Sequence, residues 1–139
     1  MSRRERAPRR LVADGHVYLW SLRHHHDTAP DGRPSHCRET LTLFPQEAGP
    51  GRTALRIVFA EGPGRYVPGG APLGSGDVGH VHGPDLNLHE PGAVRALLDE
   101  ALARGWQPGR HRREEIDGWT LLEAAAAALD ARRSEAAGS

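Results

Sequence analysis

The chain has 139 residues, of which 37% are hydrophobic and 26% are charged, and its 18 basic residues balance 18 acidic ones. This length fits one domain with a real core, and the balanced charge offers no general attraction for nucleic acid or an anionic membrane. The apolar runs are far shorter than the ~20 residues that span a bilayer, so a membrane protein is not expected. No signal-peptide pattern follows the basic start, and the single cysteine, Cys37, cannot form an internal disulfide. These features predict a cytoplasmic protein.

Three strands are predicted in the first half of the chain. In residues 17–23, β-branched and aromatic residues alternate with others, so that Tyr18 and Trp20 share one face. Residues 38–44 and 54–60 show the same alternation of apolar with other residues, and proline and glycine supply turns between the segments. Three consecutive strands with turn-like links predict an antiparallel meander.

Residues 62–77 are predicted to form a long loop, because their glycines and prolines break helices and central strands. Loops of this length are often functional, so the segment is either a binding lid or rim, or a disordered stretch. Residues 74–79 match the Gly-x-Gly-x-x-Gly dinucleotide fingerprint, but no helix is expected after them to receive a pyrophosphate. We interpret that match as a coincidence. A short strand is expected near residues 78–82.

The clearest predicted element is a helix over residues 91–104. From Val94 onward, apolar residues recur at the i, i+3, i+4, i+7 and i+8 positions, and opposite charges pair on the other side. Pro91 suits the first turn, Gly105 suits the left-handed position that follows the last turn, and Trp106 can fold back on that turn.

A short polar edge strand over residues 112–117 and a second helix complete the predicted order. Thr120 and Glu123 have the spacing of a capping box, with Trp119 as the hydrophobic staple. They should open an alanine-rich helix that ends near Arg133.

The predicted fold class is α+β, an antiparallel β-meander of three to five strands that two C-terminal helices cover on one face. A single domain is expected over residues 11–133, between a basic disordered tail at 1–10 and a second tail at 134–139. An exposed tryptophan would mark an interface; otherwise the three tryptophans are core and corner residues, namely Trp20, Trp106 and Trp119.

Nine histidines are the main candidates for chemistry, because neutral imidazole is the commonest metal ligand. Alternation in His80-Val81-His82 would place both rings on one strand face, and the outer members of His24-His25-His26 have the same spacing. With His89 as a third imidazole, His80 and His82 could hold zinc with an open position, and two imidazoles with Asp27 or Asp85 would do the same. The spacings match no pattern specific to one metal, and surface histidines at strand ends explain the same residues. No cofactor is therefore the leading expectation, and zinc is the alternative.

No complete catalytic constellation is present, so no catalytic residue is predicted. The chain contains no lysine, which excludes a Gly-Lys-Ser/Thr phosphate loop, and Cys37 is more typical of a small buried hydrophobe than of a nucleophile. All basic residues are arginine, which we interpret as codon bias rather than as bidentate recognition of phosphate or carboxylate. The basic stretches at residues 3–10 and 110–113 have acidic neighbours and indicate solvated surfaces rather than nucleic-acid sites.

Two motifs resemble those of a set of uncharacterised small bacterial proteins. The first is Asp14-Gly15-x-x-Tyr18-x-Trp20-Ser21-x-Arg23. The second begins at Asn87-Leu88-x-x-Pro91 and ends at Ala101-Leu102-Ala103-Arg104-Gly105-Trp106-x-Pro108. The resemblance extends over residues 11–122 and implies a compact domain of strands followed by helices, without an activity, a cofactor or catalytic residues.

The leading functional prediction is a non-catalytic binding or interaction module that uses the sheet face or the glycine-rich loop. Its expected partner is another protein or a second copy of the chain; neither a membrane nor nucleic acid is expected. The alternative, from a different class, is a metal-dependent zinc-type enzyme built on a His-x-His cluster.

Overall fold

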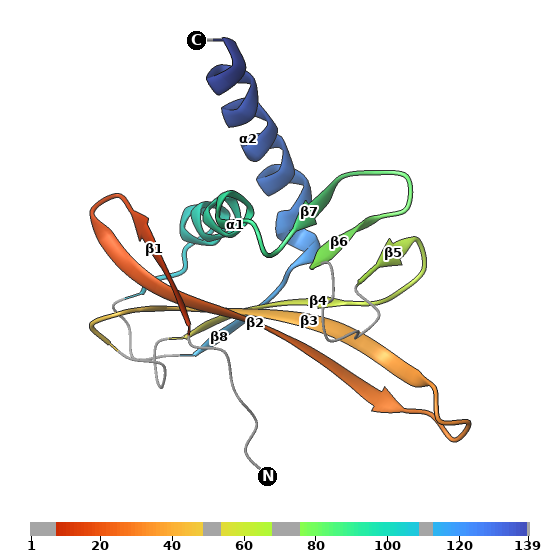
Figure 1. The fold of residues 1–139 in the computed structure, drawn as a ribbon. Helices are drawn as coiled ribbons and strands as arrows, with labels where there is room; N and C mark the ends of the chain where they lie inside the picture. Colours follow the sequence, from red (N-terminus) through yellow and green to blue (C-terminus); the bar gives the residue numbers. More distant parts are fainter. Residues whose placement is uncertain (1–7, 49–53, 68–75, 109–112, 139) are drawn as a thin grey trace.

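The computed structural model describes residues 8–48, 54–67, 76–108 and 113–138. They form β1 (Arg9–Ala13), β2 (His16–Thr28), β3 (Pro34–Pro45), β4 (Leu55–Ala60), β5 (Arg65–Tyr66), β6 (Asp77–His80), β7 (Asp85–Asn87), α1 (Pro91–Ala103), β8 (Glu114–Asp117) and α2 (Trp119–Gly138). Both helices lie on one side of a large sheet, together with a small second sheet (Figure 1). Neither of the two described helices is long and apolar enough to cross a bilayer.

The large, or main, sheet has five strands in the order β1-β2-β3-β4-β8. Its neighbours are antiparallel from β1 to β4, and β8 joins β4 in parallel after the chain has passed through the small sheet and α1. The α+β fold class is confirmed, with the meander at the centre of the sheet and the short polar strand at its edge.

The first strand, β1, was not predicted. Arg9 and Arg10 lie in it, opposite Trp20 and Leu19 of β2, where a disordered tail up to residue 10 was expected. The guanidinium of Arg9 lies 4.7 Å from the centroid of the Trp20 ring, a cation–π contact between strands. The rest of the expected tail, residues 1–7, lies outside the described residues. Pairing with β2 thus orders a basic segment whose composition alone indicates a tail.

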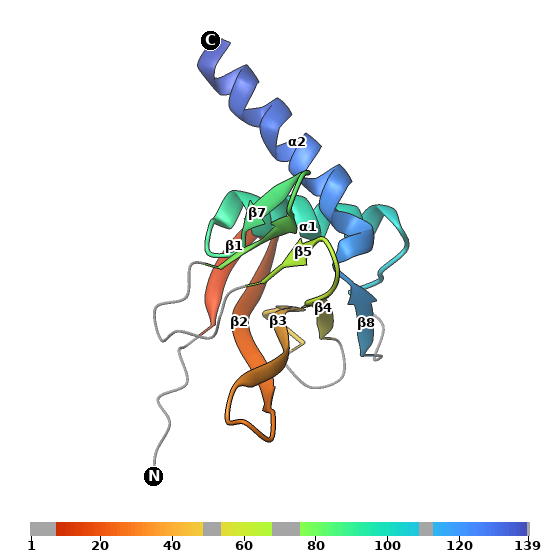
Figure 2. The same cartoon turned by 90° about the vertical axis from the view of Figure 1, so that its right-hand side faces the viewer.

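Strands β2 and β3 are longer than predicted and form a hairpin that projects beyond the other strands (Figure 2). The pairing of β4 with β3 ends at Arg38, opposite Ala60, and Glu61 adds two hydrogen bonds to the backbone of Cys37, one through its amide and one through its carboxylate. Beyond Cys37, hydrogen bonds within the hairpin join its own two strands. At its tip, the amide of Ala29 donates to the carbonyl of Arg33 over 2.8 Å.

The hydrophobic core lies between the main sheet and the two helices. Five inward positions of β3 and β4 are fully buried apolar side chains, namely Leu41, Leu43, Leu55, Ile57 and Phe59. They belong to one cluster with the leucines of both helices, namely Leu97, Leu98, Leu121 and Leu122. Burying each such side chain stabilises the fold by roughly 1.5–3 kcal/mol, so this packing is its main source of stability. All three tryptophans are buried in the same cluster, as expected for core and corner residues.

The C-terminal end of α1 matches the sequence prediction. Gly105 has a φ of +108°, and its amide donates to the carbonyl of Leu102 over 3.1 Å. The amide of Trp106 donates to the carbonyl of Ala101 over 3.0 Å, which completes a Schellman motif. This turn brings Trp106 back onto the helix, where its ring is buried.

Both ends of α2 differ from the prediction. The helix begins at Trp119, and its cap comes from Asp117, whose Oδ1 accepts the Trp119 amide over 3.1 Å. Thr120 donates its hydroxyl back to the Asp117 carbonyl over 2.6 Å, so the predicted capping box is replaced by this earlier cap. At the other end, the helix continues past Arg133 through the expected tail to Gly138, as an exposed, alanine-containing turn that projects from the core (Figure 1).

The small sheet, in the order β5-β6-β7, occupies part of the segment that was predicted as a loop. β5 lies inside the expected loop at residues 62–77, while residues 68–75 lie outside the described residues. The strand expected near residues 78–82 is present as β6 but ends at His80, and β7 was not predicted.

A substitution at Gly118 tests the packing at the junction of β8 and α2. A Cβ at this position would lie 2.5 Å from Cε2 and from Cζ of the fully buried Phe59. Gly118→Ala should therefore lower the free energy of unfolding by about 1–3 kcal/mol, measured by urea denaturation. The matched control is Gly62→Ala, whose Cβ would have Arg65 Cδ at 3.9 Å as its nearest neighbour and should change stability by less than about 0.5 kcal/mol. Equal stability of the two variants would contradict the packing.

Candidate functional site

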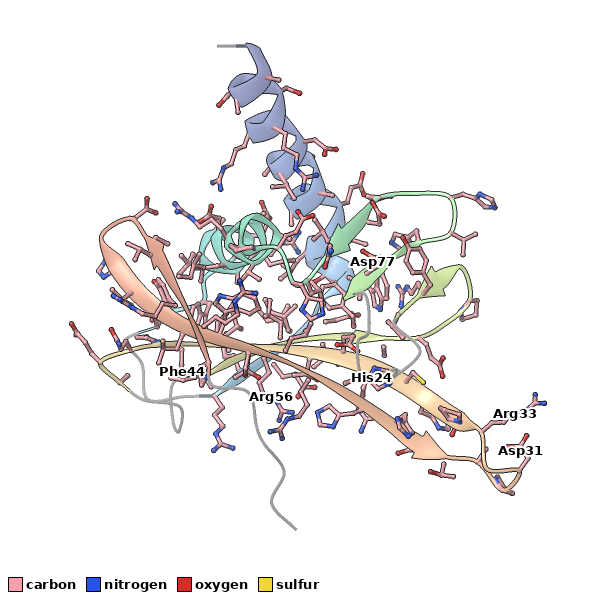
Figure 3. The ribbon with its side chains drawn as sticks, viewed as in Figure 1. His24, Asp31, Arg33, Phe44, Arg56 and Asp77 are labelled. Carbon is pink, nitrogen blue, oxygen red and sulfur yellow. The ribbon has the colours of Figure 1, made fainter. Side chains whose placement is uncertain are left out.

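The outer face of the main sheet points away from both helices, and no helix or strand in the described part of the chain covers it (Figures 1 and 3). Its side chains alternate with the core positions along each strand. On β2, β3 and β4 they are Val17, Leu19, Ser21, Arg23, His25, Arg38, Thr40, Thr42, Phe44, Arg56 and Val58. Figure 3 shows Arg56 on this outer side.

This outer face has an apolar end and a basic end. At the apolar end, Val12 is opposite Val17, and Leu19 is opposite Phe44, which is 5% exposed. At the basic end lie Arg23, His25, Arg38 and Arg56, which we name the basic patch. Among the described residues the face has no exposed aromatic side chain on which a nucleic acid base could stack.

Strand register places the basic patch around Thr40 of β3. Arg23 is directly opposite Thr40 on β2, and Arg38 lies two residues earlier on the same strand. His25 and Arg56 occupy diagonal positions, because His25 is opposite Arg38 and Arg56 is opposite Thr42. Opposite and diagonal neighbours in a sheet are within reach of long side chains. The three arginines therefore have neighbouring backbone positions around Thr40, which is only 3% exposed. The guanidinium of Arg38 donates from Nη1 to the carbonyl of His36 over 3.1 Å.

The charges of all three arginines act on the imidazole of His25. Burial lowers the pKa of His25 from its ordinary value, and the charges of Arg38, Arg23 and Arg56 lower it further. Neither Arg38 nor Arg56 forms an ion pair with another described residue. The three arginines therefore produce a positive potential at His25.

Acidic side chains on the outer face include two on the edge strand β8. There Glu115 is opposite Arg56, and Asp117 is opposite Val58. They border the basic patch on the side of β8. Guanidinium groups bind carboxylates and phosphates through paired hydrogen bonds, so the arginines of the patch have the chemistry to bind an anion.

A buried polar pair lies on the inner side of the same strands. His24 Nδ1 donates a hydrogen bond to Glu39 Oε1, and the Glu39 side chain is only 4% exposed. Burial raises the pKa of Glu39, whereas the hydrogen bond from His24 and the charges of His24 and His89 lower it. The histidines thus compensate in part for a carboxylate placed in the core.

The three predicted zinc ligands lie in different surroundings. His80 ends β6 and packs against Trp119, with 5.3 Å between the ring centroids. His82 is exposed in the turn that follows, because the strand does not continue far enough to place it beside His80. His89 lies half-buried next to Gly76, whose Cβ, if present, would be 2.5 Å from His89 Cδ2.

Among the described residues, no group of three His, Cys, Asp or Glu side chains could hold a metal ion. The structure thus does not bring His80, His82 and His89 together. The other predicted pair, His24 and His26, does lie close, with ring centroids 5.6 Å apart. Zinc binding stays a prediction, which elemental analysis of untagged protein tests. A stoichiometric metal that is lost in the His80→Ala, His82→Ala double variant would support it.

A groove of about 290 Å³ lies on the helix side of the fold, between the small sheet and α2. Its lining carries the carboxylates of Asp77, Asp85, Glu90 and Asp130. Glu90 accepts a hydrogen bond from Arg133, and the Tyr66 hydroxyl donates to Asp85 Oδ2 over 3.2 Å. Figure 3 shows Asp77 on the opposite side of the main sheet from Arg56. The groove on the helix side thus has four carboxylates and one arginine, Arg133, in its lining.

Sequence reasoning missed the basic patch, because its arginines are distant in the chain and were interpreted as codon bias. A signal was nevertheless present. Arg23, Arg38 and Arg56 each occupy an outward position of a predicted strand, and the three strands were predicted to be neighbours. Combining alternation with strand order would have placed them together.

Comparisons with protein-family models, with curated proteins and with solved structures find no match for the chain. The resemblance to small bacterial proteins stays a prediction. The structure itself is an α+β fold in which helices cover the inner face of the main sheet and the outer face carries the basic patch.

The buried pair predicts a pH-dependent loss of stability in His24→Ala. Without His24, the Glu39 carboxylate loses its hydrogen-bond donor in the core, so the free energy of unfolding at pH 7 should fall by about 2 kcal/mol. In this variant the pKa of Glu39, which burial already raises, should rise further. Because the folded state then holds the Glu39 proton more tightly than the unfolded state does, the free energy of unfolding falls as the pH rises from the ordinary carboxyl range to the raised pKa. The loss should thus be smaller at pH 5 than at pH 8, measured by urea denaturation.

The control for this prediction is Glu39→Gln, which removes the charge but keeps an oxygen that accepts from His24 Nδ1. Its loss of stability should be below about 1 kcal/mol. A loss in His24→Ala that is identical at pH 5 and pH 8 would show that the charge of Glu39 is not the cause.

Proposed function

We propose that the protein is a non-catalytic binding module and that its basic patch binds an acidic protein partner. The observation that carries this proposal is the strand register that places Arg23, Arg38 and Arg56 on three neighbouring strands of the outer sheet face, where the charges of all three act on His25. The proposal includes a cytoplasmic location, which the single cysteine indicates.

Recognition suits this patch better than catalysis. Arginine stays protonated throughout the physiological range, so it offers fixed positive charge and directed donors rather than proton transfer. The strands that carry the three arginines are anchored by fully buried residues on their inner side, including Leu41 and Ile57. A rigid base of this kind keeps the donors in place before the partner arrives, which limits the entropy cost of binding.

A second copy of the chain is a partner that the same chemistry allows. Two basic patches would repel each other, whereas a patch could face the acidic groove lined by Asp85 and Asp130 of another copy. Such contacts are heterologous and produce chains or rings rather than a symmetric pair. Native mass spectrometry at low and high salt distinguishes this arrangement from binding of a different protein.

Charge reversal in the patch provides the main test. Arg38→Glu, Arg56→Glu should weaken binding of a fluorescent oligoglutamate peptide by about tenfold or more, because attraction becomes repulsion at the centre of the patch. Fluorescence anisotropy at low ionic strength measures the affinity.

The matched control is Arg33→Glu, Arg104→Glu, which changes the net charge equally at two exposed arginines elsewhere. It should retain most of the affinity. Equal weakening by both double variants would mean that the peptide responds to total charge, and the patch would then not be the binding site.

A further inference from the structure

We propose that His24 and His26 bind one divalent transition-metal ion of the zinc type and that Glu39 orients His24 for this contact. The site lies on the inner side of β2 and β3, where the projecting hairpin begins. It shares no residue with the basic patch on the outer face, so this inference is independent of the proposed function.

The hydrogen bond between His24 and Glu39 leaves one nitrogen of His24 for a metal ion. Neutral imidazole has one N–H donor and one nitrogen with a lone pair, and the hydrogen bond of one nitrogen decides which nitrogen binds a metal. His24 donates from Nδ1 to Glu39 Oε1, so the lone pair of the neutral ring is on Nε2. This Nε2 atom is buried and has no hydrogen-bond partner in the described part of the chain. Because buried polar atoms normally have a partner, the atom indicates a ligand from outside the chain.

His26 supplies a second imidazole at a separation that suits a shared ion. Residues two apart on a strand point to the same side, and the ring centroids of His24 and His26 lie 5.6 Å apart. With zinc–nitrogen bonds of about 2.0–2.1 Å, two imidazoles at a tetrahedral angle have their centroids roughly 5 Å apart. A small rotation of the side chains therefore brings one nitrogen of each ring to the same ion.

His26 is also free to make this movement and gives the ion access from solvent. It is exposed, and it has no hydrogen bond or ion pair with another described residue. His25, which lies between the two ligands in the chain, is on the outer face opposite Arg38 and does not contribute. The site is therefore a chelate of two alternate residues, open on the side of His26.

Glu39 is the positioning residue of the site. A carboxylate that accepts from the second nitrogen of a metal-bound imidazole fixes the tautomer of the ring and makes it a stronger ligand. Glu39 is directly opposite His24 on β3, and its side chain is buried. The register of the sheet thus holds the acceptor in place before the ion binds.

The ligand set defines the class of ion. Imidazole nitrogen suits Zn²⁺, Cu²⁺ and Ni²⁺, whereas Mg²⁺ and Ca²⁺ take oxygen ligands. The described residues offer no third side chain at this position, so water completes the coordination. Zn²⁺ should consequently bind in the presence of excess Mg²⁺.

The test is calorimetric titration of the untagged full chain with Zn²⁺ at about pH 7.5, where most free imidazole is neutral. One ion per chain should bind, and His26→Ala should weaken the affinity by about tenfold or more, because one of the two ligands is lost. This variant is preferred to His24→Ala, which loses a buried hydrogen bond as well. The matched control is His25→Ala, which removes an adjacent imidazole from the outer face and should change the affinity by less than about twofold.

NMR of the histidine ring nitrogens tests the positioning role of Glu39. Zn²⁺ should shift the Nε2 resonance of His24, while Nδ1 keeps its proton. Glutamine can donate as well as accept, so Glu39→Gln should raise the fraction of the metal-free His24 ring that carries its proton on Nε2, and it should weaken Zn²⁺ binding. A weaker affinity with an unchanged tautomer would contradict the positioning role.

Three results would overturn the site. The first is the absence of Zn²⁺ binding tighter than about 0.1 mM. The second is equal weakening by His25→Ala and His26→Ala, which would mean that the ion responds to any surface imidazole. The third is loss of binding in the His80→Ala, His82→Ala double variant with retention in His26→Ala. None of these results affects the basic patch, whose test uses an acidic peptide.

Discussion

The packing of the inner face of the main sheet against α1 and α2 is the constraint on which the rest of the structure depends. Because side chains alternate along a strand, burying Leu41 and Ile57 forces Thr40 and Arg56 outward. A slip of one residue would bring the arginines into the core and expose the leucines, at a cost far above the stability of a small domain. The register that builds the core thus also builds the basic patch.

The same register explains the buried pair of His24 and Glu39. Both occupy inward positions, directly opposite each other, where the apolar part of β2 and β3 ends and the projecting hairpin begins. A carboxylate at such a position is stable only with a donor, which His24 supplies. The pair therefore marks the boundary of the core, and the hairpin beyond it is held chiefly by pairing between its own strands. The inner side chains of β2, β3 and β4 thus stabilise the fold, and the outer side chains of the same strands form the proposed binding surface.

Local sequence patterns predicted the fold class and the end of α1. The features that the sequence analysis missed, such as β1 and the basic patch, depend on contacts between residues that are distant in the chain. The Schellman turn at Gly105 depends on a few consecutive residues, so the sequence contains the whole signal. β1 forms through its pairing with β2 and the burial of Leu11 and Ala13, which composition alone does not indicate. The zinc hypothesis failed to foresee that His80, His82 and His89 lie in different surroundings although they are close in the chain. The basic patch needs the pairing of three strands, which no single stretch of sequence specifies. α2 continues to Gly138, and near the end of its predicted length Arg132 forms an ion pair with Asp99 of α1 at 2.8 Å.

The most direct test of the central claim, that the outer sheet face is the binding surface, is an NMR titration of isotope-labelled protein with an acidic peptide. The account predicts amide shift changes centred on Thr40 and on its neighbours in β2 and β4, which fade as salt is added. Changes centred on the groove around Asp85 and Asp130, with the amide of Thr40 unaffected, would contradict it.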